Sequence, residues 1–455
     1  MKKLFCGLCL LVSITFLRAQ SPIARHVVLI SIDGMRPEFY LDPTWPAPNL
    51  RVLMKQGVYA DHLKSVFPAY TYPSHTAMVT GALPARSGIY FNQPKGSKGD
   101  WNWFMDSIKV PTIWQQLKRA GLTTAAVEWP VSVGKDIDYN LPEIWSNEHP
   151  EDRITEARKY ATPGLIEEVE REATGRLDGH SMNEDHFSLD ENAARAAGYI
   201  FSRYKPSLLA VHFACVDGME HEYGREHDSV RLAVGSADRA VGDVLEAIVR
   251  TGLRDSTVVI IVGDHGFCTI NTVFRPNLLI KDLPGKFITA GGSAFLYRNT
   301  DTSPAGDAAL IKAVRDKLDA LPSEKRKLFR ILDRKELDRL GADPTAVFGL
   351  AAVPGLVFSG STKAAPVTNQ GPGTSIQQDP LEGVFLPVKG GHHGYDPNEP
   401  QMYTGFITAG AGIIKGGHIN ELSEPDIAPL IARLLGIEFK APDGKLVSGI
   451  VQPAL

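Results

Sequence analysis

The chain has 455 residues, of which 43% are hydrophobic and 22% charged, and its formal net charge is −4. An acidic balance argues against a protein that follows nucleic-acid polymers by charge attraction. Any binding of phosphate by such a chain must depend on local positive charge, which metal ions can supply.

The first twenty residues have the layout of a secretory signal peptide. Two lysines precede an apolar run from Leu4 to Leu17, and the small residue Ala19 follows. The run is shorter than the roughly 20 apolar residues that cross a bilayer, and no later segment is apolar enough to do so. We therefore expect an exported chain, periplasmic or secreted, without a transmembrane segment. The two remaining cysteines, Cys215 and Cys268, can form one disulfide or remain as buried thiols.

Strand and helix patterns alternate along most of the chain. Buried parallel strands are predicted for the runs rich in β-branched residues: 26–32, 123–128, 208–216 and 257–262. Helices are predicted where apolar residues recur three and four apart: 48–56, 112–119, 190–204 and 230–250. A last strand and helix are expected at 403–409 and 424–435. This alternation indicates an α/β sandwich with a central, mainly parallel sheet and helices on both faces.

Two stretches interrupt the alternation and are expected to be insertions in a single catalytic domain of residues 21–455. Residues 138–183 are rich in charge, and residues 271–388 contain two polar helical patterns, Asp307–Leu321 and Ser323–Leu340, before a Gly/Pro-rich segment. Insertions of this kind often shape a substrate entrance.

Three aspartates come directly after predicted strands: Asp33, Asp217 and Asp264. The carboxyl ends of parallel strands meet at one edge of a sheet, so these side chains are expected to converge despite their separation in sequence. A single Asp before Gly is more often only a turn residue. Three carboxylates at one edge require cations.

Histidines accompany these aspartates. His221 follows Asp217 by four residues, His265 is adjacent to Asp264, and a late GGHHGYD segment adds His392 and His393. Mixed carboxylate and imidazole ligands suit zinc. Other histidines are expected to be surface or hydrogen-bonded residues: His149, His180, His186, His227 and His418.

The segment VFPAYTYPSHTAMVTG contains a candidate nucleophile. Thr71 precedes Pro73 by two residues, and Pro is typical of a first helical turn. A hydroxyl at a helix N-terminus lies where an anionic phosphate is stabilised, and metal coordination would lower its pKa. Taken alone, Thr71 would more often be an ordinary helix cap.

The ordered motifs SIDGMRPEF, TYPSHTAMVTGALPARSGIYFN, VDGMEHEYG, GDHG and GHHGYD resemble the nucleotide pyrophosphatase/phosphodiesterase (type I phosphodiesterase) family of the alkaline phosphatase superfamily. The resemblance covers residues from about 26 to 437. It implies an alkaline-phosphatase-like sandwich with inserted cap segments and two Zn²⁺ per chain. The implied ligands of one zinc ion are Asp217, His221 and His393, and those of the other are Asp33, Asp264, His265 and the Thr71 oxygen.

The resemblance also implies a mechanism and two substrate contacts. Thr71 would attack phosphorus and form a phospho-threonine intermediate that water hydrolyses. Asn92 would hydrogen-bond a non-bridging phosphate oxygen, and Tyr72 would stack on a nucleotide base. The implied substrate is a small phosphodiester or phosphoanhydride, either nucleotide or phospholipid-like, and not a nucleic-acid polymer.

Three other functions fit the same pattern. A phosphomonoesterase would need an additional lysine–arginine pair, and Lys135 has no such arginine near it in sequence. A phosphonate hydrolase would use the same metal ligands with a different pocket. A non-catalytic binding protein would be expected to have lost a ligand or the nucleophile, whereas all seven positions are filled here.

Overall fold

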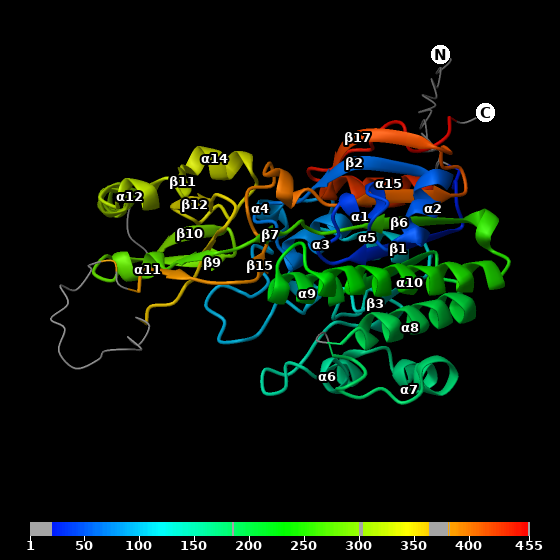
Figure 1. Ribbon diagram of the computed structural model, residues 1–455. Helices are drawn as coiled ribbons and strands as arrows, with labels where there is room; N and C mark the ends of the chain where they lie inside the picture. Colours follow the sequence, from blue (N-terminus) through cyan, green and yellow to red (C-terminus); the bar gives the residue numbers. More distant parts are fainter. Residues whose placement is uncertain (1–20, 184–185, 300–303, 364–380, 382, 454–455) are drawn as a thin grey trace, which may run out of the picture.

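The computed structural model describes residues 21–183, 186–299, 304–363, 381 and 383–453 (Figure 1). The predicted signal peptide lies outside these residues. No helix within them combines the length and apolar character needed to cross a membrane. A large α/β part carries a smaller lobe at one end of the molecule (Figure 1).

An eight-stranded sheet forms the centre of the large part, with the order β17-β2-β16-β6-β1-β5-β3-β4. Strand β16 runs antiparallel to β6 and β2, and the other described pairings in this sheet are parallel. The predicted mainly parallel sheet is therefore confirmed. The strands are β1 (His26–Ile32), β2 (Val58–Lys64), β3 (Thr124–Val127), β4 (Tyr139–Leu141), β5 (Leu208–Phe213), β6 (Thr257–Val262), β16 (Phe406–Gly410) and β17 (Gly417–Ser423).

Helices cover both faces of this sheet, because every second residue of the central strands points to each face. In β1, Val28, Ile30 and Ile32 belong to one buried cluster and Val27 and Leu29 to another. The first face is covered by α2 (Pro48–Gln56), α8 (Ser188–Tyr204) and α10 (Asp228–Arg250), and the second by α3 (Thr71–Thr80), α5 (Ile113–Arg119) and α15 (Ile427–Leu435).

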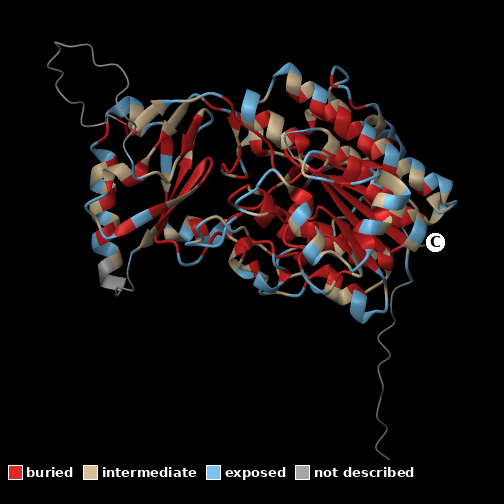
Figure 2. Ribbon diagram, turned by 90° about the horizontal axis from the view of Figure 1, so that it is seen from below, coloured by how far each residue is buried: buried red, intermediate tan, exposed pale blue. Residues whose placement is uncertain are grey.

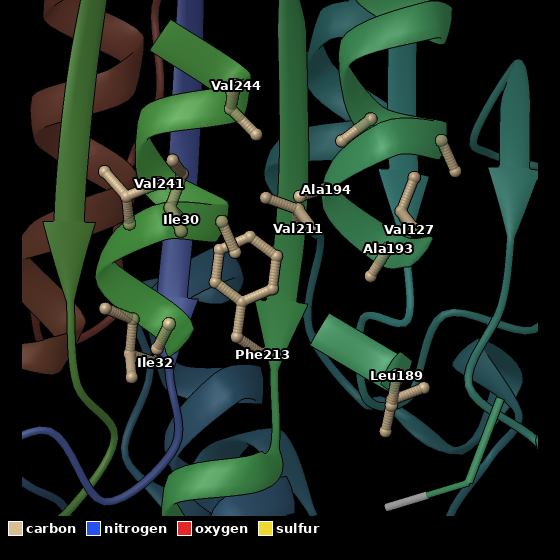
Figure 3. Packing of buried hydrophobic residues seen from close by; sticks show 14 of the residues in the cluster. Ile30, Ile32, Val127, Leu189, Ala193, Ala194, Val211, Phe213, Val241 and Val244 are labelled. Carbon is tan, nitrogen blue, oxygen red and sulfur yellow. The ribbon is translucent and has the colours of Figure 1, made fainter. Parts of the chain in front are cut away.

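Figure 3 shows the first of these faces from close by. Side chains of α8 and α10 lie against strand residues that include Ile30, Val211 and Phe213, all fully buried. The central strands are buried over their whole length (Figure 2). Burial of this kind contributes about 25 cal/mol for each Å² of apolar surface, so the sheet and its two helical layers form one stable frame.

The insertion at residues 138–183 contains more regular structure than its sequence indicated. Two short helices, α6 (Arg153–Tyr160) and α7 (Leu165–Val169), follow β4, and a five-residue π-helical turn, Glu170–Thr174, follows α7. Their buried residues Ile154, Leu165 and Val169 belong to the same cluster as α8. Apolar side chains spaced along a charged segment therefore join this insertion to the main core.

The second insertion forms most of the smaller lobe around a hydrophobic cluster of its own. Its four-stranded antiparallel sheet has the order β11-β12-β10-β9. The elements are β8 (Thr272–Phe274), α11 (Pro276–Leu279), β9 (Gly285–Ala290), β10 (Ser293–Arg298), α12 (Pro304–Asp319), α13 (Ser323–Arg326), β11 (Phe329–Leu332), α14 (Arg334–Arg339), β12 (Phe348–Ala352), β13 (Leu356–Phe358) and β14 (Phe385–Pro387).

The predicted helix Ser323–Leu340 is wrong in its middle. Residues Phe329–Leu332 form β11 and pair with β12, because Phe329 and Leu332 are buried by the lobe while the flanking short helices keep their polar faces outside. Tertiary burial here outweighs the local helical pattern. The described cysteines, Cys215 and Cys268, are both free and buried, so no bridge joins them.

Candidate active site

The three aspartates meet at the carboxyl edge of the central sheet. Asp33 directly follows β1, Asp264 lies two residues beyond β6, and Asp217 lies in α9 (Cys215–Tyr223), which follows β5. The three strands are neighbours, with Ile32 opposite Phe213 and Ser31 opposite Val262, so they end at the same level. The convergence predicted from the sequence is present.

Distances divide the predicted residues into two adjoining groups. In the first, His265 Nε2 lies 3.2 Å from Asp33 Oδ1, 3.3 Å from Asp264 Oδ2 and 3.4 Å from Thr71 Oγ1. In the second, Asp217 Oδ1 lies 3.5 Å from His221 Nε2 and 3.7 Å from His393 Nε2. A separation of 3.9 Å between Asp217 Oδ1 and His265 Nε2 connects the groups. All seven candidate ligands therefore surround one small volume.

The ring orientation of the three histidines suits metal binding. Each ring has its Nδ1 atom against a backbone carbonyl: His393 at 2.9 Å from Ala69, His221 at 3.1 Å from Gly391, and His265 at 3.3 Å from Gly266. A carbonyl can only accept, so Nδ1 carries the proton and Nε2 presents its lone pair toward the aspartates. Carbonyl groups fix ligating histidines in this way in metal sites.

The glycines before His392 explain how the late segment reaches this place. A Cβ atom on Gly390 would lie 2.3 Å from the carbonyl oxygen of His221, and one on Gly391 would lie 2.4 Å from that of Glu220. Gly390 also has a φ of +111°, which L side chains rarely adopt. Only glycine allows the loop to lie directly on α9, and this contact brings His393 beside Asp217.

The electrostatics of the cluster call for a cation. Burial and the neighbouring carboxylates raise the pKa of Asp33, and burial together with Asp217 raises the pKa of Asp264 to about 7. Burial, followed by the neighbouring imidazoles, lowers the pKa values of His265 and His393. Asp33 Oδ1 and Asp264 Oδ2 are buried and accept no hydrogen bond from the described N–H groups. Divalent cations would compensate these costs, and the donor set of three carboxylates, three imidazoles and one hydroxyl fits zinc.

Thr71 is the first residue of α3 and is 8% exposed. The N–H group of Tyr72 donates to Asn92 Oδ1 at 3.0 Å, which leaves Asn92 Nδ2 available as a donor. His75 Nδ1 lies 2.8 Å from the Thr71 carbonyl oxygen and fixes the first turn of the helix. The hydroxyl, the helix N-terminus and a side-chain amide therefore lie together, as an anionic phosphate requires.

A pocket of about 390 Å³ opens beside Thr71, between the large part and the lobe. It is lined by Tyr70, Asn92, Trp101 and residues 93–97 of the large part and by Lys286–Thr289 of β9. The expected base-stacking role of Tyr72 does not fit this geometry, because Tyr72 is fully buried against Trp101, with the ring centroids 5.2 Å apart. The residue on the other side of Thr71, Tyr70, is partly exposed in the pocket.

Two buried histidines, His75 and His212, and one glutamate near the cluster were not singled out in the sequence. His75 and His212 lie edge to face at 4.6 Å, and His212 Nε2 is 3.0 Å from Asp33 Oδ2. Glu220 is ion-paired with Arg36 at 3.0 Å. His392, His221 and His393 each have a possible ligand atom within 4.8 Å of the other two, and none of the aspartates belongs to this group. The sequence signal that could have identified His212 is its place as a polar residue within an otherwise apolar strand. The five histidines expected to be non-ligands belong to none of the metal-like groups in the described residues.

Comparison with known proteins identifies the class. A model of the type I phosphodiesterase / nucleotide pyrophosphatase family matches residues 27–396, and the chain belongs to this family. It is accordingly a phosphodiesterase-type enzyme.

Individual relatives have low sequence identity but align with most of this chain. Ectonucleotide pyrophosphatase/phosphodiesterase family member 7 of Rattus norvegicus is 23% identical over 452 residues, which cover 95% of this chain and 87% of the relative. The bis(5'-adenosyl)-triphosphatase of Mus musculus is 23% identical over 429 residues, with coverages of 93% and 80%. Murine ectonucleotide pyrophosphatase/phosphodiesterase 5, an inactive threonine-to-alanine variant in complex with AMP, has a TM-score of 0.64 at 18% identity and covers 92% of this chain and 97% of its own. The last likeness concerns the fold.

Proposed function

We propose that the chain is a phosphodiesterase with two Zn²⁺ per chain that hydrolyses small phosphodiesters or phosphoanhydrides through a phosphorylated Thr71. One observation carries the proposal: six carboxylate and imidazole side chains form one cluster with separations of 3.2–3.9 Å, and its member His265 lies with Nε2 3.4 Å from the Thr71 hydroxyl oxygen. The six are Asp33, Asp217, Asp264, His221, His265 and His393. The first zinc ion would be held by Asp217, His221 and His393, and the second by Asp33, Asp264, His265 and Thr71.

Bound zinc ions would lower the pKa of the Thr71 hydroxyl and balance the negative charge of the phosphate. Thr71 Oγ1 forms a bond to phosphorus as the bond to the leaving oxygen breaks, which gives phospho-threonine. Asn92 Nδ2 donates to a non-bridging oxygen, and the N-terminus of α3 favours the same negative charge. Attack by water then releases the phosphate monoester and restores the hydroxyl.

The pocket beside Thr71 is the place for the organic part of the substrate. Tyr70 and Trp101 offer aromatic faces, and Lys286 is an exposed cation on β9. Base stacking on Tyr70 or Trp101 would explain a nucleotide substrate, and the AMP complex of the murine relative supports this choice. A phospholipid-like substrate is the other candidate, since the same aromatic side chains would contact an acyl or aryl group.

The test is a substrate panel with the purified chain and added zinc. Bis-p-nitrophenyl phosphate, p-nitrophenyl thymidine monophosphate and p-nitrophenyl phosphorylcholine are compared with the monoester p-nitrophenyl phosphate. Preference for a diester is expected, with thymidine or choline identifying the substrate class. Preference for the monoester would contradict the proposal and favour a phosphomonoesterase. Failure to bind two zinc ions, combined with no turnover, would favour a non-catalytic binding protein.

Export to the periplasm or the cell exterior is part of the proposal. It depends on the signal-like residues 1–20 and is consistent with extracellular relatives such as the venom phosphodiesterases. Sequencing the N-terminus of the mature protein from culture medium or periplasm tests it, and a chain that keeps Met1 in the cytoplasm would contradict it.

A further inference from the structure

His212 is a buried histidine in the middle of an apolar strand. It lies in β5, where its neighbours Leu209, Val211 and Phe213 are fully buried, and it is itself 2% exposed. Strand β5 pairs with β1 so that His212 stands opposite Ser31, two residues before Asp33. An imidazole at this position is costly to bury unless both ring nitrogens have partners.

Both partners are acceptors. His212 Nδ1 lies 3.1 Å from the carbonyl oxygen of Glu128, and His212 Nε2 lies 3.0 Å from Asp33 Oδ2. The carbonyl fixes a proton on Nδ1, so the contact with Asp33 needs one further proton between the ring and the carboxyl group.

This contact assigns different tasks to the two oxygens of Asp33. Oδ2 is held by His212, whereas Oδ1 points to His265 Nε2 at 3.2 Å and accepts no hydrogen bond from the described N–H groups. Asp33 has one free ligand atom, and its direction is fixed by a side chain from the neighbouring strand. Carboxylate ligands held by such partners keep one orientation, and loss of the partner weakens metal affinity by about 10- to 100-fold.

We propose that His212 is a positioning residue that turns Asp33 so that Oδ1 alone faces the metal centre. The inference rests on the two-metal site of the proposed function and adds a residue outside the seven ligands. His212 Nε2 holds Oδ2 at 3.0 Å, which leaves Oδ1 as the Asp33 atom that would face a cation. Strand β5 thus supports the ligand at the end of β1 from the side.

Two substitutions separate this role from simple core packing. His212→Gln places an amide N–H near the position of Nε2, so a donor to Asp33 is kept. His212→Asn places its shorter amide near the position of Nδ1, so the contact with Glu128 is kept and the donor to Asp33 is lost. His26→Asn is the matched control, because His26 is also a buried histidine with Nδ1 on a backbone carbonyl, that of Pro206 at 2.8 Å, at the far end of β1.

The measurement is the zinc dissociation constant of each full-length metal-stripped variant, obtained by competition with a chromophoric chelator, together with the thermal midpoint. We expect zinc binding at one of the two sites to weaken about 10- to 100-fold in His212→Asn and by less than threefold in His212→Gln. His26→Asn is expected to lower the thermal midpoint without changing zinc affinity.

Equal zinc affinities of the Asn and Gln variants would overturn the proposal, as would an equal loss in the His26 control. If His212→Asn does not fold, the Gln variant decides: wild-type affinity supports the positioning role, and a tenfold loss in a folded protein contradicts it. Wild-type protein that binds no zinc would instead refute the two-zinc function, so the two failures are distinguishable.

Discussion

Replacement of Asn92 tests the phosphate-binding geometry most directly, because its amide has two separable tasks. Asn92 Oδ1 accepts the N–H group of the fully buried Tyr72 at 3.0 Å, and Nδ2 is the proposed donor to the phosphate. In Asn92→Ala both contacts are lost. Loss of one donor to a developing oxyanion lowers kcat by about 10²–10³-fold, which corresponds to roughly 2.7–4 kcal/mol. The unpaired, buried N–H group costs a further ~1–3 kcal/mol of folding free energy.

Asn92→Asp separates the two tasks. Its carboxylate still accepts from Tyr72, so the free energy of unfolding should stay near that of the wild type, while the donor becomes a negative oxygen that repels phosphate. We expect kcat on the preferred diester to fall at least as far as in the alanine variant. Asn140→Ala, which removes the buried bond from Nδ2 to Ser132 at 2.8 Å, is the control and should lower stability alone. An Asn92→Asp enzyme that keeps more than a tenth of the wild-type kcat would refute the reasoning.

Four further outcomes are expected. Thr71→Ala should abolish turnover in a diester assay, while metal analysis still finds zinc on the six remaining ligands; measurable turnover would exclude Thr71 as nucleophile. His393→Ala should lose zinc on dialysis and His392→Ala should retain it, and the reverse would identify His392 as the ligand. Burial raises the pKa of Asp190 to about 6, so the folded wild type holds a proton that the unfolded chain releases near pH 4. The wild-type free energy of unfolding should therefore fall between about pH 4 and 6 relative to Asp190→Asn, by ~3 kcal/mol at most, and parallel denaturation curves would contradict this. Lys286→Ala should raise KM for substrates whose leaving group is a phosphate but not for those that release nitrophenol, and equal effects would exclude a charge contact.

The strands and helices around the site could be predicted well from the sequence because they depend on local signals. Strands β1 and β6 and helix α2 have the predicted bounds. The two strands are runs rich in β-branched residues, and the helix is an amphipathic segment that begins at Pro48 and ends before Gly57. Asp33 and Asp264 then follow from their places after buried strands. The predicted strand 208–216 is wrong at its end, because β5 stops at Phe213 and Asp217 lies in α9, which begins at Cys215. Parallel strands carry their carboxyl ends to one edge, so proximity in space could be inferred without any measured contact.

The immediate surroundings of the site were harder to predict because they depend on pairing across the chain. Tyr72 was expected in the substrate pocket from its place after Thr71, but the first turn of α3 directs it into the core against Trp101. The role of His212 depends on the register of β5 with β1 and on the carbonyl of Glu128, which is 84 residues away in sequence. No local pattern contains that information.

The pocket shows why substrate preference is the least predictable property of this chain. One wall comes from the loop after Asn92 and the other from β9, nearly two hundred residues later. A partly buried contact joins the two parts, because Lys95 Nζ lies 2.6 Å from Asp343 Oδ2 and 2.7 Å from Thr345 Oγ1 of the lobe. The charge of Lys95 is balanced by that of Asp343, and this ion pair links the two walls of the pocket. Lys286 is exposed on β9. Under the proposed function the metal ligands would select a phosphate, and we expect the group that the phosphate carries to depend on the contact between the two walls and on the charge of Lys286.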